Sequence, residues 1–310
     1  MKLSLSTNWC NRRLQSGEEI AAKALELGFD ELELGFHTTW FQVQGFKRMR
    51  DRIPVGSIHA FCPVPISAPQ GYPELYTLAS FDEDARALAR FHVRKNVEFA
   101  AEMGADTVVL HAGRAMFCGR FFARGFDSCV LRAALEKAKG RLDDRRYRRL
   151  LAKARKVRDV RAAKLLEVLR GEIAALVPEL ERRGVVLALE NLPYLEGFPD
   201  EAETAKLLEW FRGAPVRAWF DTGHHRVRAM HGWVAPGADL AALPVQGMHL
   251  NDVVDYNDDH LAPGDGKVDF AALEGLAKSV RHVVFEPHAH VAEERLRKGV
   301  EHIRRLWNMV

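Results

Sequence analysis

The segment Arg217-Ala-Trp-Phe-Asp-Thr-Gly-His-His225 begins as a short apolar run and ends in a carboxylate and two imidazoles. The segment Gly247-Met-His-Leu-Asn-Asp252 has the same design. A buried strand has this pattern when it delivers polar side chains to a site at its C-terminal end. Carboxylates and imidazoles are also the side chains that hold divalent metals. The two segments therefore predict strands that contribute to one metal site.

Short strand-like runs of this kind recur along the chain, and most are followed by a longer stretch with helical spacing. There are eight of them, at residues 3–6, 31–35, 56–61, 107–113, 185–190, 217–221, 247–250 and 282–286. Uniformly apolar runs are typical of parallel strands that are covered on both faces. Eight β/α units in roughly 250 residues plus an insertion indicate an α/β protein with a closed (β/α)8 TIM barrel.

A doubly wound open sheet is the alternative architecture. The first predicted strand lacks the Gly-x-Gly-x-x-Gly turn of dinucleotide-binding folds. Polar residues also end many of the strands, whereas an open sheet gathers them at one switch point. The barrel is therefore the preferred fold, as a single domain that spans residues 1–310.

A basic block interrupts the alternation after the fourth strand. Residues 131–170 contain 15 Lys/Arg and 5 Asp/Glu, a local charge of +10 in a chain whose net charge is +3. Apolar residues keep helical spacing from Tyr147 to Leu180. We therefore expect a basic helical insertion at about 114–168. Its simplest interpretation is a solvated helical face, and the alternatives are a subunit contact in a homo-oligomer or a phosphate-rich ligand.

Composition bounds the class of protein. With 310 residues, 47% of them hydrophobic, the chain can bury a large core. Its four cysteines are scattered without a Cys-x-x-Cys pair, which predicts reduced thiols. No apolar run approaches the roughly 18 residues of a membrane span, and no signal-peptide pattern is visible. We therefore expect a cytoplasmic protein with no membrane partner.

Ionisable residues end six of the eight predicted strands. They are His59, His111, Glu190, Asp221 with His224, His249 with Asp252, and Glu286. A lone histidine at a strand end is usually structural, but a carboxylate that ends an apolar strand is costly to bury unpaired. In a parallel barrel all of these ends meet at one rim. The set together predicts a site for a divalent cation such as Mn, Co or Zn.

Four motifs carry a resemblance to a known family. They are Leu-Glu190-Asn, Phe-Asp221-Thr-Gly-His224, Met-His249-Leu-Asn-Asp252 with the downstream run His260-Leu-Ala-Pro-Gly-Asp-Gly-Lys-Val-Asp-Phe270, and Phe-Glu286-Pro. Together they resemble the xylose isomerase-like TIM-barrel superfamily of sugar phosphate isomerases and epimerases. The resemblance covers most of the chain outside residues 114–168.

The resemblance implies a divalent metal ion (Mn, Co, Zn or Mg) held by Glu190, Asp221, His249 and Glu286. It also implies a pocket for a small carbohydrate; the substrate-binding candidates at its rim are His59, His111 and His224.

The activity that follows from the resemblance is that of a metal-dependent isomerase or epimerase of carbohydrate metabolism. A bound metal would acidify the carbon beside a substrate carbonyl and stabilise the resulting enediolate. Glu190 and Glu286, from strands five and eight, would then act as catalytic base and acid on opposite sides of a sugar or sugar phosphate. A related metal-dependent dehydratase is an alternative.

Endonuclease IV, a multinuclear zinc phosphodiesterase that acts as an AP endonuclease, belongs to the same superfamily and provides a second hypothesis. His59, His111 and the pair Asp258-x-His260 could be additional metal ligands, and the basic insertion could contact phosphates. Against it, the pair lies closer behind His249 than in that family, and residues 263–270 resemble the epimerase loop. The basic block also lacks interleaved aromatic residues beyond Tyr147, which argues against a nucleic-acid partner.

A third hypothesis is a barrel that binds a metabolite without catalysis. Two opposed carboxylates that could both act as bases argue against it, because a binding protein has no use for them. The isomerase or epimerase is therefore the preferred function.

Overall fold

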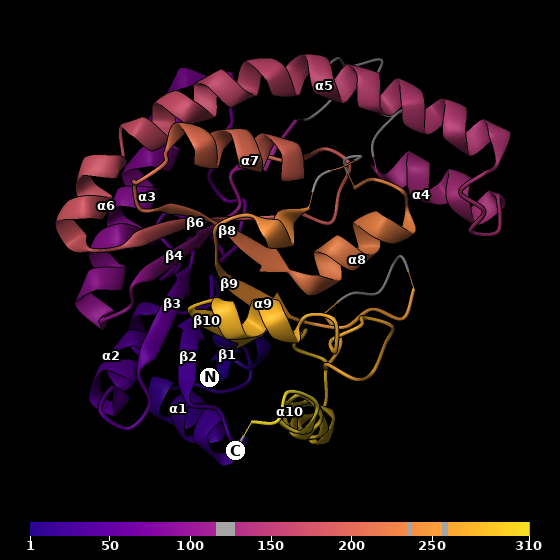
Figure 1. Cartoon of the computed structure of the whole chain (residues 1–310). Coiled ribbons are helices and arrows are strands. Elements are labelled where there is room, and N and C mark those ends of the chain that lie inside the picture. The colour runs from indigo at the N-terminus through magenta and orange to yellow at the C-terminus, as the bar shows by residue number, and fades with distance from the viewer. Residues whose placement is uncertain (116–127, 235–236, 238, 256–259, 310) are drawn as a thin grey trace.

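The computed structural model describes residues 1–115, 128–234, 237, 239–255 and 260–309. Eight parallel strands close into a barrel in the order β1-β10-β9-β8-β6-β4-β3-β2 (Figure 1). They are β1 (Ser4–Ser6), β2 (Glu31–Leu34), β3 (Val55–His59), β4 (Thr107–Leu110), β6 (Val186–Glu190), β8 (Val216–Asp221), β9 (Val245–Leu250) and β10 (His282–Phe285). The predicted (β/α)8 barrel is confirmed, and the open sheet is excluded.

Helices surround the barrel and connect its strands (Figure 1). They are α1 (Gly17–Glu26), α2 (Trp40–Met49), α3 (Glu83–Met103), α6 (Val177–Arg183), α7 (Glu201–Trp210), α8 (Thr222–Met230), α9 (Glu274–Ser279) and α10 (Glu293–Leu306), with the 3-10 turns η1 (Thr7–Trp9) and η3 (Leu240–Ala242). Local sequence sets their ends. Ser16 and Glu19 form a capping box at the start of α1, and α3 ends at Gly104 in the left-handed conformation.

The inside of the barrel is filled below the rim. Val109, Ala188, Trp219 and Val284 form an apolar cluster there, separate from the larger core between strands and helices. A Cβ atom at Gly247 would lie 2.3 Å from the Trp219 ring, so the bulky ring requires glycine on the neighbouring strand. The Trp219 ring lies edge-on against the imidazole of His249, with centroids 5.0 Å apart. Trp219 therefore packs as an apolar layer directly beneath His249 at the rim.

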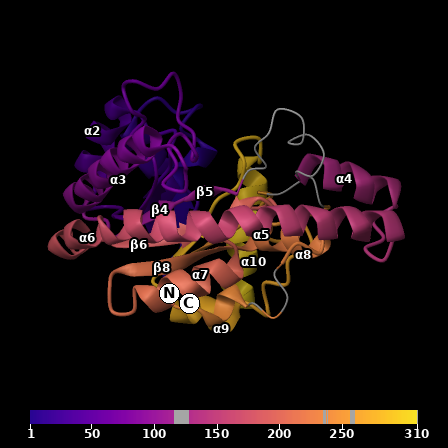
Figure 2. The ribbon, with the colours of Figure 1, turned by 90° about the horizontal axis from the view of Figure 1, so that it is seen from above.

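The predicted insertion is helical in its described part and follows the fourth barrel strand. A short strand, β5 (Gly113–Arg114), pairs with β7 (Gly197–Phe198), and two helices follow, α4 (Ser128–Lys137) and α5 (Arg145–Ala174). Figure 2 shows the α4 end of this pair reaching beyond the barrel. We call α4 and the first half of α5 the arm.

A small hydrophobic cluster, separate from the main core, packs the arm against the rest of the protein. Leu131, Leu135, Tyr147, Ala154, Leu195 and Trp233 form this cluster. The Tyr147 hydroxyl donates to the carbonyl of His231 at 2.6 Å and accepts from the Trp233 indole at 3.1 Å. One face of the basic insertion is therefore buried, and the solvated-face interpretation applies only to its outer side.

Three of the cysteines are free thiols: Cys10 and Cys62 are buried, and Cys129 is exposed. Cys118 lies outside the described residues. Among the helices in the described ranges, none is both long enough and apolar enough to cross a membrane.

Candidate metal centre

Four side chains of metal-ligand type meet at the C-terminal rim of the barrel. Glu190 ends β6, Asp221 ends β8, His249 lies near the end of β9, and Glu286 follows β10. One ligand atom from each lies within 4.8 Å of the others, and all four residues are buried. The parallel register explains part of this, because Asp221 is the direct partner of His249 across the β8–β9 pair.

Carboxylate oxygens converge on one ring nitrogen of His249. Its Nδ1 lies 3.0 Å from Oε2 of Glu286, 3.2 Å from Oε1 of Glu190 and 3.7 Å from Oδ2 of Asp221. Three carboxylates and one imidazole are a donor set that suits Mn, Co, Zn or Mg. The residues present therefore fit the divalent ion that the sequence predicts.

Buried charge gives a second reason for a cation at this position. Burial lowers the pKa of His249, but Glu286, Glu33 and Glu190 together raise it well above its usual value. Burial raises the pKa of Glu190, yet the imidazoles of His111 and His249 hold it well below the ordinary range. Burial also raises the pKa of Asp221. The negative charge of Asp221 is thus the least compensated in this group, and a divalent ion would stabilise it.

The other ring nitrogen of His249 faces a carboxylate that sequence reasoning missed. Nε2 lies 3.0 and 3.2 Å from the two oxygens of Glu33, on β2, and the Ser57 hydroxyl donates to Glu33 at 2.9 Å. A carboxylate in this position holds the proton on Nε2 and leaves Nδ1 free to bind a metal. The available signal was the run Glu31-Leu-Glu-Leu34, whose alternation directs Glu33 into the barrel.

Two asparagines hold Asp221 in place. Asn251 donates to Oδ2 of Asp221 at 2.8 Å, and Asn191 accepts from its backbone N–H at 2.7 Å. Asp221 is also the N-cap of α8, because its Oδ1 accepts from the His224 N–H at 2.6 Å. A Cβ at Gly223 would lie 1.7 Å from the Asn251 amide oxygen. The glycine of Asp-Thr-Gly-His is thus required by the close approach of Asn251.

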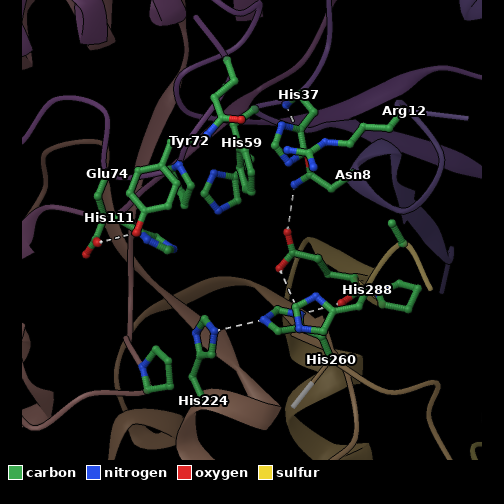
Figure 3. Close-up of a pocket in the computed structure, with 18 of the residues that line it drawn as sticks. Asn8, Arg12, His37, His59, Tyr72, Glu74, His111, His224, His260 and His288 are labelled. Carbon is green, nitrogen blue, oxygen red and sulfur yellow. Dashed lines mark hydrogen bonds and ion pairs between the residues drawn. The ribbon is translucent and has the colours of Figure 1, made fainter. Parts of the chain in front are cut away.

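Two further groups of ligand-type residues share these carboxylates. Oε2 of Glu190 lies 3.1 Å from Nε2 of both His59 and His111, and the three residues form one group. Asp221 forms another with His224 and His260. Figure 3 shows His224 pointing at His260, and their Nε2 atoms are 3.1 Å apart.

The structure therefore brings together the predicted metal and substrate-binding residues, apart from Asp258. Asp258, predicted as an additional metal ligand beside His260, lies outside the described residues.

Asp252, which the sequence places at the same rim, has a different position. Its carboxylate accepts from the backbone N–H groups of Gly264, Gly266 and Val268, at 3.0, 2.8 and 2.9 Å. It therefore holds the loop after β9 and lies apart from the three ligand groups. His260 belongs to the same loop and is tied to β10 through its Nδ1, 2.7 Å from the Glu286 carbonyl.

A cavity of about 890 Å³ opens above the rim (Figure 3). Its lining includes Glu286, the histidines His37, His59, His111, His224, His260, His288 and His290, and the arginines Arg12 and Arg114. Arg114 is bound on both sides, since its Nε lies 2.8 and 2.9 Å from the Glu74 oxygens and its guanidinium stacks 3.8 Å from the Tyr194 ring. Such a volume is typical of sites for small molecules.

The closed barrel with its polar C-terminal rim defines a TIM-barrel protein. Residues 21–306 match the family described as the xylose isomerase-like TIM barrel. The chain belongs to this family, which confirms the resemblance seen in its motifs. No curated protein matches the chain.

Solved structures with the same fold include several sugar epimerases. A 3-keto-D-glucoside 4-epimerase from E. coli aligns with a TM-score of 0.66 and 16% identity, over 98% of this chain and 99% of that one. A D-tagatose 3-epimerase-like protein aligns with a TM-score of 0.64 and 19% identity, over 100% of this chain and 98% of that one. A D-psicose 3-epimerase solved in the presence of D-fructose aligns with a TM-score of 0.60 and 14% identity, over 99% of each chain. At these identities the likeness establishes the fold.

Proposed function

We propose that this chain is a divalent-metal-dependent isomerase or epimerase that acts on a small sugar or sugar phosphate. The observation that carries the proposal is the approach of Glu190 and Glu286, from strands β6 and β10, to the same nitrogen of His249. Glu286 lines the cavity, so its carboxylate can reach a bound substrate. The epimerases among the solved structures of the same fold support this class of reaction.

Glu190, Asp221, His249 and Glu286 would hold the metal. When bound, the ion would polarise a substrate carbonyl and its neighbouring hydroxyl and so acidify the carbon between them. Glu286 is placed to exchange a proton with that carbon. Its Oε2 faces His249, whereas its Oε1 accepts a hydrogen bond from the Asn8 amide at 3.3 Å.

The second proton-transfer group differs from the simple pair of carboxylates expected from the sequence. Glu190 is fully buried and does not line the cavity, because His59 and His111 lie in front of its Oε2. Both imidazoles line the cavity. We assign the second role to Glu190 acting together with His111, which can pass a proton between the carboxylate and the substrate. His59 instead supports Glu190, because its Nδ1 lies 3.0 Å from the Ala60 carbonyl and its Nε2 faces the carboxylate.

Solvent exchange would test this function. The metal-loaded chain is incubated in D2O with a set of ketoses and ketose phosphates, and deuterium at the carbon beside the carbonyl is followed by NMR. We expect exchange with at least one substrate and its loss in Glu286→Gln, with Glu293→Gln on the surface of α10 as the control. Absence of exchange across the set, with metal bound, would overturn the proposal.

A second candidate function is hydrolysis of a phosphoester at a multinuclear site. The observation that favours it is the sharing of Glu190 and Asp221 among three ligand groups, since two-metal sites of phosphoryl transfer use carboxylates between neighbouring ions. Metal counting by mass spectrometry separates the two functions. One ion per chain supports the isomerase or epimerase, and two or three zinc ions support the hydrolase.

A further inference from the structure

The two arginines that line the cavity differ in whether an acidic side chain pairs with them. Arg114 is neutralised by Glu74 and stacked on Tyr194. Arg12 is exposed and lines the same cavity, and it forms no ion pair with any residue in the described part of the chain. A guanidinium that lines a cavity without an acidic partner is available to an anionic ligand.

Asn8 and His37 lie between Arg12 and the candidate metal centre along one side of the cavity. It follows η1, and Figure 3 shows it beside His37 and Asn8. Asn8 accepts from the His37 backbone N–H at 3.3 Å and donates to Oε1 of Glu286 at 3.3 Å. A ligand that reaches Glu286 at one end can therefore extend along Asn8 to Arg12 at the other.

The groups beside Arg12 add no negative charge that would neutralise it. Burial and the nearby charge of Arg12 lower the pKa of His37 to about 4, so at neutral pH its ring is an uncharged hydrogen-bonding group. Among the described lining residues, the acidic ones are Glu74, which Arg114 neutralises, and Glu286, which faces the metal centre.

We propose that Arg12 and His37 form a subsite for the phosphate group of the substrate. This inference rests on the proposed function and narrows its substrate class to phosphorylated sugars. The guanidinium offers a planar pair of N–H groups to the phosphate oxygens, and the neutral ring of His37 offers one further N–H from a second loop. A dianionic phosphate has enough oxygens to use all of them.

The test compares substrates and variants. For wild type, kcat/KM for a ketose phosphate is expected to exceed that for the same ketose without phosphate. The ratio of these two kcat/KM values should fall about 10- to 100-fold in Arg12→Gln, through a higher KM for the ketose phosphate. This is the effect expected for loss of a charge-assisted hydrogen bond. Arg12→Lys should restore part of the ratio.

Arg13→Gln is the matched control. The Arg13 side chain lies over the Trp9 ring at 4.5 Å and donates to the Trp9 carbonyl, and Arg13 does not line the cavity. The ratio of kcat/KM for the ketose phosphate to kcat/KM for the ketose should equal the wild-type ratio in this variant. A ratio in Arg12→Gln that equals the wild-type ratio would overturn the subsite.

A binding measurement separates this proposal from the proposed function. Inorganic phosphate is titrated into the metal-loaded chain and into metal-loaded Arg12→Gln, and binding is followed by calorimetry. Weaker phosphate binding in the variant supports the subsite even if no sugar turns over, in which case only the isomerase function fails. Equal phosphate binding by the two proteins would overturn the subsite, whatever the activity.

Discussion

Nε2 of His249, on β9, lies 3.0 Å from Oε1 of Glu33, on β2. The two strands are not neighbours in the barrel, since β10 and β1 lie between them. This contact across the barrel sets the orientation of the imidazole and directs Nδ1 toward Glu190, Asp221 and Glu286. The proposed metal centre therefore depends on a carboxylate that is not itself one of the four proposed ligands.

The role of Glu33 can be tested by metal affinity. Glu33→Gln should weaken metal binding about 10- to 100-fold, because the amide supports the tautomer of His249 less well than a carboxylate does. Competition with a fluorescent chelator would measure the change. Glu31→Gln, two residues away on β2 and paired with Lys2, is the control and should bind metal as wild type does. Equal affinity in Glu33→Gln would contradict the orienting role.

The packing under the site can be tested at Gly247. Gly247→Ala should destabilise the fold by roughly 1–3 kcal/mol, because its Cβ would overlap the Trp219 ring and the filled barrel interior leaves little room for the ring to move. Urea unfolding would measure the loss. Gly275→Ala on α9, whose Cβ would meet nothing within 4 Å, should instead be neutral or stabilising by about 0.5–1 kcal/mol. Similar effects of the two changes would contradict this account.

The pH dependence of stability should include a contribution from His231. Burial is the main cause that lowers its pKa to about 4, from a model-peptide value of 6.5. The unfolded chain therefore binds this proton more readily than the folded one, so stability is lost as the pH falls from about 6.5 toward 4. For one such group the loss between pH 7 and pH 5 is roughly 2 kcal/mol.

His231→Phe, which keeps a ring stacked on Trp233, removes this titration. The variant should lose less stability than wild type between pH 7 and pH 5, as measured by urea unfolding at both values. If the two proteins lost the same amount, the titration of His231 would not be a source of the acid sensitivity.

The docking of the arm should depend on the hydroxyl of Tyr147. Tyr147→Phe removes a donor to the His231 carbonyl and an acceptor for the Trp233 indole, both in a buried cluster. Leaving these groups without their partner should cost about 1–3 kcal/mol. Hydrogen exchange of the α4 amides would report the loosened arm, and amides of β6 serve as the internal control. Unchanged protection of α4 would show that apolar packing alone holds the arm.

The strand ends were predictable because each combines an apolar run with a terminal polar side chain. Glu190, Asp221, His249 and Glu286 all have this pattern, and the barrel brings them together as expected. Asp252 has the same pattern but turns toward the loop after β9, where backbone N–H groups bind it. The sequence alone could not distinguish these two outcomes, because both are ways to satisfy a buried carboxylate.

Sequence by itself determined the class of fold and the chemical types at the rim of this protein. Both follow from short-range patterns: apolar runs of strand length, helical spacing between them, and ionisable residues where the runs end. Only the tertiary structure decided how those residues work together. Barrel closure placed Glu33 behind His249 and set His59 and His111 in front of Glu190. It also left Arg12 on the cavity wall, where none of the described acidic residues pairs with it. Such contacts join segments far apart in the chain, and their partners are chosen by strand register and packing, which local patterns do not specify.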